Sequence, residues 1–199
     1  MTKAERIAEF GDLWRDYTDE ESDALIIGNE ALIKFLDNGF FDAPASTKYH
    51  GAYEGGLYDH SKQVFLRLKD LTEKNGLEWQ RPESPFIIGM FHDLCKCDQY
   101  IPVYLNEYES DGNGKLVVSP KIERYEYNTN TILKGHGAKS VMLLSQFITL
   151  TEEEMLCIRY HMGPYEKEEW AEFDQAIRKY QNVYWTHAAD MLASKVDNV

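Results

Sequence analysis

A short run of residues in this chain is apolar on every side, which limits the folds that the chain can adopt. Residues 86–91 read Phe-Ile-Ile-Gly-Met-Phe and follow Ser84 and Pro85. Proline at the first helical position marks a helix start, so we expect Ser84 to cap a helix over residues 85–95. A helix that is apolar all round has no face for water. It must therefore lie at the centre, with other elements packed around it.

The remaining sequence predicts helices that can surround this one. Apolar residues recur at helical spacing in the segments 4–17, 20–36, 57–71, 137–147, 152–161, 170–180 and 183–195. Residues 40–56 have the composition of a long loop. Residues 101–127 change period around a turn rich in Gly, Asn and Asp at 110–114, which predicts a β-hairpin. We expect an all-α bundle of about seven to nine helices, with one inserted β-hairpin near residues 100–127.

Length and composition limit the classes of protein to consider. The 199 residues are 43% hydrophobic, enough for one domain with a real core. We expect residues 1–199 to form a single domain, with helices from residues 1–40 packed on the rest. The 34 acidic residues outnumber the 21 basic ones, and the net charge is −13. Duplex nucleic acid and anionic membranes require a basic face, so we expect neither as a partner.

Targeting signals are not evident in the sequence. The first residues are charged and amphipathic, unlike the apolar core of a signal peptide. No segment approaches the roughly 18 apolar residues that cross a membrane. Three cysteines are an odd and low number, which suits a reducing compartment. We expect a cytoplasmic protein, and the sequence does not indicate its oligomeric state.

Several titratable residues occupy positions where apolar residues are expected. His92 and Asp93 end the central helix, and Lys96 follows on the same face as His92. His60 lies on the core face of its helix, and Asp190 stands among small and apolar residues. Burying such groups is costly unless they are paired or bind a metal.

Two further histidines extend this set. His136 begins a predicted helix and His161 ends another. Six residues from five helices could thus face one centre, as in bundle metal sites: His60, His92, Asp93, His136, His161 and Asp190. Imidazole and carboxylate ligands suit a divalent transition metal such as Fe, Mn, Zn, Co or Ni. Any one of these histidines alone is more often structural, so the prediction depends on the set.

Five short motifs, in order, resemble those of the HD-domain metal-dependent phosphohydrolases. Residues 49–60 (YHGAYEGGLYDH) resemble the opening motif of the branch with an HHAYEGGLLEH-type sequence. Residues 92–96 (HDLCK) resemble HDxGK, residues 133–136 (LKGH) resemble LxGH, residues 159–163 (RYHMG) resemble SHHG, and residues 188–190 end on AD. Together the motifs span residues 44–193. Cys95 replaces the family's glycine, and Met162 replaces a histidine.

The resemblance implies an HD-type helical bundle and a ligand set for one or two metal ions. It assigns His60, His92, Asp93 and Asp190 to a first ion, with Asp93 bridging to a second ion at His136 and His161. Because Met162 replaces a possible ligand, the second site has fewer residues to hold its ion. The implied reaction is attack of a metal-activated water on a small phosphorylated substrate, such as a nucleotide or phosphodiester. Asp93 and Lys96 would be the catalytic side chains.

Four more residues are candidates for substrate binding. His50 matches the first histidine of the opening motif, and it either binds substrate or braces the loop at Gly55-Gly56. Lys134, Lys139 and Arg159 flank the expected ligands and could bind substrate phosphate, although exposed helix charges are the alternative.

Two other functions remain open from the sequence. HD-type diiron oxygenases resemble the same order of ligands and lack a second consecutive histidine, so Met162 favours them. A regulatory protein that binds a metal or nucleotide without turnover is the second alternative.

Overall fold

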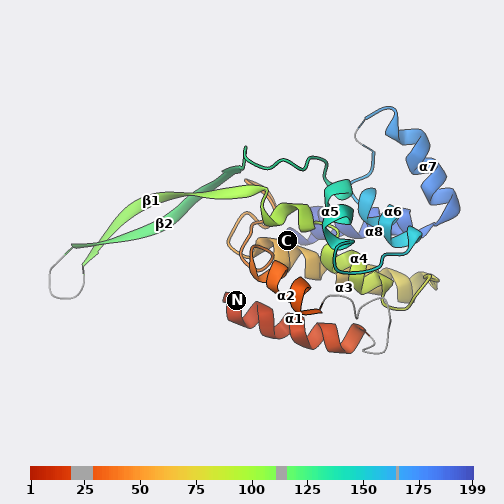
Figure 1. Ribbon diagram of the computed structural model, residues 1–199, viewed down its shortest axis with the longest axis horizontal. Coiled ribbons are helices and arrows are strands. Elements are labelled where there is room, and N and C mark those ends of the chain that lie inside the picture. Colours follow the sequence, from red (N-terminus) through yellow and green to blue (C-terminus); the bar gives the residue numbers. More distant parts are fainter. Residues whose placement is uncertain (19–28, 111–115, 165) are drawn as a thin grey trace.

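The computed structural model describes residues 1–18, 29–110, 116–164 and 166–199 (Figure 1). The helices are α1 (Lys3–Tyr17), α2 (Asn29–Asp37), α3 (Gly56–Asn75), α4 (Ser84–Phe91), α5 (Gly137–Leu144), α6 (Glu152–Arg159), α7 (Glu169–Lys179) and α8 (Asn182–Leu192), with a 3₁₀ turn at Leu94–Cys97 and a π-helical turn at Ala193–Asp197. Two strands, β1 (Tyr100–Ser110) and β2 (Leu116–Tyr127), form one antiparallel hairpin. The prediction of a mainly helical chain with one hairpin is confirmed. Residues 20–28 of one expected helix, and most of the expected turn at 110–114, lie outside the described residues.

The central position of α4 is confirmed. Every residue of α4 is buried, and α3 and α6 pack against it. Gly89 permits this approach, because a Cβ at that position would lie 2.4 Å from the Cα of Phe65 in α3. Any larger residue would push the two helices apart.

The expectation that Ser84 caps α4 is wrong. Ser84 is the first residue of the helix, and its hydroxyl donates a hydrogen bond to Oε1 of Glu154, 2.8 Å away in α6. The carboxylate of Glu154 also accepts two hydrogen bonds of 2.7 Å from Arg81. Because Glu154 is fully buried, its charge requires hydrogen-bond donors, and the Ser84 hydroxyl donates to it instead of capping α4.

One continuous cluster of buried apolar side chains joins the N-terminal helices to the others. Phe10 of α1 and Leu36 of α2 belong to the same cluster as Phe91 of α4 and Val183 of α8. Figure 1 shows α1 and α2 along one side of the bundle. Within the described residues, no helix combines the length and apolar character needed to cross a bilayer.

The hairpin is the element that departs from the bundle. The described parts of β1 and β2 extend away from the helices as a two-stranded arm (Figure 1). The pairing shifts by one residue between Val103 and Tyr104, where a bulge lies in the ladder. Only the 3₁₀ turn at Leu94–Cys97 separates the end of α4 from the start of β1 at Tyr100, so the base of the arm lies close to the end of α4.

Candidate metal centre

The six predicted ligands converge in the structure. They are His60 from α3, His92 and Asp93 directly after α4, His136 directly before α5, His161 just beyond α6, and Asp190 from α8. Oδ2 of Asp93 lies 3.6 Å from Nε2 of His60 and 3.4 Å from Nε2 of His92. Its other oxygen, Oδ1, lies 2.8 Å from Nε2 of His136 and 3.4 Å from Nε2 of His161. Asp93 therefore stands between two groups of histidines.

Asp190 belongs to the first of these groups. Its Oδ1 lies 3.1 Å from Nε2 of His60. The first group is thus His60, His92 and Asp190, and the second group is His136 and His161. Asp93 presents one carboxylate oxygen to each group.

Local sequence explains why the second group forms. Gly137 follows His136, and a Cβ on it would lie 2.3 Å from the backbone oxygen of Arg159. Only glycine lets the start of α5 approach the end of α6 so closely. The approach places the ring of His136 5.2 Å from the ring of His161.

Backbone oxygens orient three of the four histidines. Nδ1 of His60 lies 2.9 Å from the backbone oxygen of Val199, and Nδ1 of His92 lies 2.9 Å from that of Gly89. Nδ1 of His161 lies 2.7 Å from the backbone oxygen of Ile158. A carbonyl oxygen only accepts, so Nδ1 donates its proton in each case. The Nε2 lone pairs are then free and point at the centre, as in metal-binding histidines.

Two of these lone pairs face one another across the centre. Nε2 of His60 and Nε2 of His92 are 3.3 Å apart. Among the described residues, Oδ1 of Asp93 and Nε2 of His136 and His161 are buried and have no hydrogen-bond partner of good geometry. A proton on His60 could satisfy Asp190, but it cannot serve the other acceptors. A divalent cation would supply the missing positive charge, so this donor set fits a transition metal.

The charges of the centre support the same conclusion. Burial opposes ionisation of Asp93, yet Lys96, His92 and His136 hold the pKa of its carboxyl well below the usual range. Burial likewise opposes ionisation of Asp190, whose pKa is nevertheless lowered by a hydrogen bond with His60 and by the nearby histidines. Burial lowers the pKa of His92. Ionised carboxylates and neutral imidazole are the forms that bind metals.

Two residues of the HDLCK motif contact these ligands. Nζ of Lys96 lies 2.6 Å from Oδ2 of Asp93, and the lysine is 5% exposed. The Sγ of Cys95 lies 3.5 Å from Nδ1 of His136. Burial raises the pKa of the Cys95 thiol to about 12, so the thiol is neutral. The sequence marked Cys95 only as a departure from the HDxGK pattern and did not reveal this contact.

Solvent reaches the centre beside His136. The side chain of His136 is 23% exposed, whereas the other five candidate ligands are almost fully buried. A cavity of about 380 Å³ adjoins His136 and is lined by Asn128, Thr131 and Lys134. A small ligand can approach the second group through this cavity.

The four residues expected to bind substrate have different surroundings in the structure. Lys134 lines the cavity beside His136. Lys139 also lines it, but its buried ammonium group forms an ion pair with Asp98. The guanidinium of Arg159 lies 3.3 Å from Glu172 on the surface and is engaged there.

His50 lies beside the first group. Its ring centroid is 4.9 Å from that of His60. Burial, together with the charges of His60 and Lys96, lowers the pKa of His50 to about 4.

Two other residues, Met162 and His187, lie next to His161 of the second group. Met162 is 38% exposed, so of the pair His161-Met162 only the histidine turns inward. Nδ1 of His187 lies 2.7 Å from the backbone oxygen of His161 and holds that segment in place.

Comparison with known proteins yields no relative: no family model, no curated protein and no solved structure matches this chain. The candidate metal centre therefore stands on its own geometry.

Proposed function

We propose that this protein is a metal-dependent phosphohydrolase of the HD-domain type. It binds one or two divalent transition metals and acts on a small phosphorylated substrate such as a nucleotide or phosphodiester. The observation that carries the proposal is the position of Asp93, which offers one oxygen to His60 and His92 and the other to His136 and His161. A bridging carboxylate between two histidine groups is suited to a pair of metal ions.

The two groups would hold their ions unequally. The first group adds Asp190 to two histidines and Asp93, which makes four protein ligands. The second group has His136, His161 and the shared Asp93, and it opens to the cavity. A site with fewer protein ligands keeps positions for water and substrate. The first ion would bind more tightly, and the second would meet the substrate.

The chain's own residues would prepare the reaction. Bound metals lower the pKa of a coordinated water and polarise phosphoryl oxygens. Lys96 is held against Asp93 and supplies a fixed positive charge near the carboxylate. Its ammonium group would offset negative charge that develops on the phosphoryl oxygens. Lys134, at the cavity, would attract the phosphate of the incoming substrate.

One experiment tests the metal and the reaction together. Protein purified without chelator is analysed for ions per chain and assayed with bis-nitrophenyl phosphate and a panel of nucleotides. Asp93→Asn should lose bound metal and hydrolysis together. Asp70→Asn, on the surface of α3 and paired only with Lys74 among the described contacts, should keep both. Undiminished hydrolysis by metal-depleted Asp93→Asn would refute the proposal.

A diiron oxygenase is the second candidate, and the exposed side chain of Met162 favours it. Its ligand set needs no second consecutive histidine. Two irons per chain, oxygen consumption and a mixed-valent iron signal would decide for the oxygenase. A metal-loaded protein without turnover in either assay would indicate a regulatory protein.

A further inference from the structure

The two-stranded arm has one face of unusual composition. Side chains alternate between the two faces of a strand, and directly paired residues share a face. The positions 100, 102, 104, 106 and 108 of β1 are Tyr, Pro, Tyr, Asn and Tyr, and their partners on β2 include Tyr125, Ile122, Pro120 and Val118. This side, called the aromatic face below, carries no charged residue at those positions.

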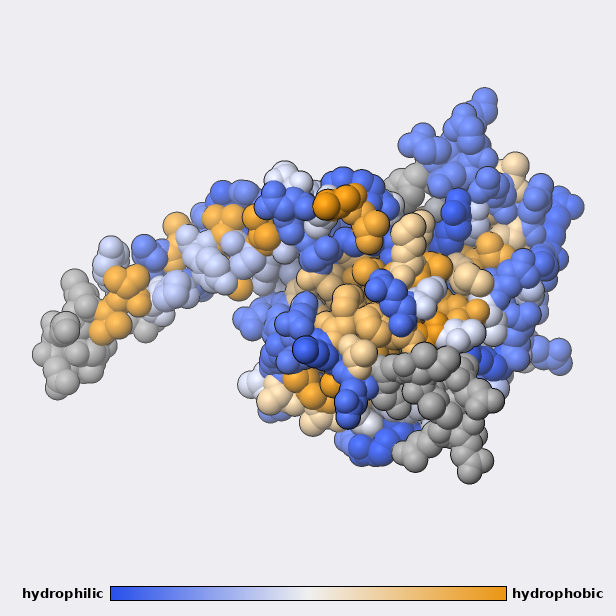
Figure 2. Space-filling model, in the orientation of Figure 1, coloured by the Kyte–Doolittle hydropathy of each residue, from blue (hydrophilic) through white to orange (hydrophobic). Residues whose placement is uncertain are grey.

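The opposite face of the arm carries its charged side chains, together with Ile101, Leu105 and Val117, which are each about half exposed. Lys121, paired with Leu105, lies 3.5 Å from Glu107, and Arg124 lies 2.8 Å from Glu126. The two faces of the arm therefore differ in charge, and the uncharged aromatic face is the one suited to cover a core. Here the aromatic face covers none for much of its length, because Tyr104 is 55%, Tyr108 65% and Val118 50% exposed. Figure 2 shows apolar residues along the arm, well outside the bundle.

An isolated pair of strands is marginally stable in water. The aromatic face needs a surface to pack on, and the described part of the bundle provides one only at the base of the arm. The length of the exposed face thus points to a binding partner.

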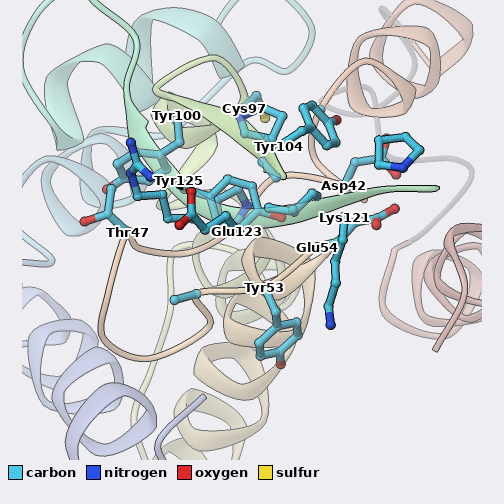
Figure 3. A pocket seen from close by; sticks show the side chains of 18 residues that line it. Asp42, Thr47, Tyr53, Glu54, Cys97, Tyr100, Tyr104, Lys121, Glu123 and Tyr125 are labelled. Atoms are coloured by element: carbon cyan, nitrogen blue, oxygen red, sulfur yellow. Dashed lines mark hydrogen bonds and ion pairs between the residues drawn. The ribbon is translucent and has the colours of Figure 1, made fainter. Parts of the chain in front are cut away.

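The base of the arm forms a trough against the bundle. The trough encloses about 780 Å³ between the aromatic face and the loop that precedes α3 (Figure 3). Tyr100, Tyr104 and Tyr125 line it from the arm, and Thr47 and Tyr53 line it from the loop. Because Tyr104 belongs to both the trough and the free part of the arm, the two form one continuous patch.

The rim of this patch has mixed charge. Asp42, Glu54, Lys121 and Glu123 surround the trough (Figure 3). An apolar centre with a polar rim is the pattern of a protein interface. Nucleic acids and anionic membranes need a dominant positive charge, which this patch does not have. A protein surface is the partner that its chemistry fits.

We propose that the partner is a second copy of this chain. The two arms pack with their aromatic faces together and in opposite directions, so that each arm lies over the trough of the other copy. A two-fold dimer requires one patch that complements itself. The continuous patch meets this requirement, since the free arm supplies the apolar side chains and the trough supplies the recess for them.

The available area suits such a dimer. Tyr53, Tyr104, Tyr108 and Val118 are each about half exposed, which at about 100 Å² each gives roughly 400 Å² of apolar surface. An interface that is about 57% apolar and contains this apolar area would bury about 700 Å² per copy. Stable complexes bury about 800 Å² per partner.

The net charge of the chain affects how two copies can associate. Two copies that each carry a net charge of −13 repel one another over most of their surface. Within the proposed contact, the aromatic face has no acidic residue at its paired positions, and the acidic side chains Asp42, Glu54 and Glu123 stand at the rim of the trough. Salt screens this repulsion, so the dimer should become tighter as ionic strength rises.

Sedimentation of the full chain over a range of concentrations and salt tests the proposal. Tyr108→Glu places a charge on the aromatic face, and Leu105→Glu places the same charge on the opposite face. Both side chains are exposed on the arm, so neither variant should unfold the bundle, which circular dichroism can verify. The wild type and Leu105→Glu should dimerise alike, whereas Tyr108→Glu should raise the dimer Kd about tenfold or more.

Four results would overturn the dimer. The wild type could remain monomeric at about 100 μM, well above the dissociation constants usual for specific dimers. Leu105→Glu could weaken association as much as Tyr108→Glu does. Salt could weaken association, or the arm could bind anionic vesicles in place of a second copy. None of these results bears on the metal centre, because neither substituted residue contacts it.

Discussion

The Sγ of Cys95 lies 3.5 Å from Nδ1 of His136. The other three histidines of the centre direct Nδ1 at backbone oxygens. A thiol sulfur is a weaker acceptor than a carbonyl oxygen. His136 is also the most exposed of the ligands. The second ion would therefore depend on the least firmly oriented histidine of the set.

Replacing Cys95 should change metal affinity selectively. Cys95→Ala removes the acceptor for His136 and should weaken binding of the second ion by about tenfold. Cys95→Ser retains a hydroxyl acceptor and should recover much of that loss. Competition with a chromophoric chelator measures both affinities. Cys157→Ala removes another buried thiol and should leave them unchanged; an equal loss in that variant would contradict the role of Cys95.

Two lysines should separate turnover from substrate binding. Lys96→Met removes the buried ammonium group beside Asp93 and should lower kcat by about 10²-fold or more, because a fixed charge is lost from the reacting centre. Lys134→Met, at the cavity, should mainly raise KM. Steady-state kinetics with a hydrolysable phosphodiester gives both constants. The assignment fails if Lys96→Met retains the kcat of the wild type while it binds metal normally.

The stability of the metal-free protein should depend on pH through His50. Its pKa is about 4 in the folded chain against an ordinary 6.5. Between these values the unfolded chain takes up a proton that the folded chain does not. The free energy of unfolding should therefore fall as the pH drops from 6.5 towards 4, and His50→Gln should reduce this dependence without abolishing it, because burial also lowers the pKa of His92. Urea unfolding of chelator-treated protein measures it, and a His50 ring that titrates near 6.5 by NMR would contradict it.

Glu154 should be critical for stability. Its buried carboxylate accepts hydrogen bonds from Arg81 and Ser84, and from the backbone of Thr151. Glu154→Ala leaves Arg81 without this partner and should cost about 3–5 kcal/mol of unfolding free energy. Glu152→Ala, two residues away, removes an exposed ion pair with Lys179 and should have little effect. Denaturant unfolding compares the two, and similar losses would show that burial is not the cause.

The helices were predictable because their signals are local. The all-apolar run 86–91 required a buried helix, and α4 is that helix. The hairpin followed from a change of period and a turn-rich segment. Ser84 was misread because its hydroxyl bonds Glu154, which is distant in sequence. Whether the arm would pack on the bundle or leave it was not encoded in any local pattern.

The candidate centre divides in the same way. Local sequence alone identifies His92, Asp93 and Asp190 as polar residues that stand among apolar ones. Local sequence could not predict that Asp93 offers one oxygen to each histidine group or that Arg159 lies beside Glu172. Such distances depend on how helices remote in sequence approach, as Gly89 and Gly137 permit, and that approach is a property of the packed core.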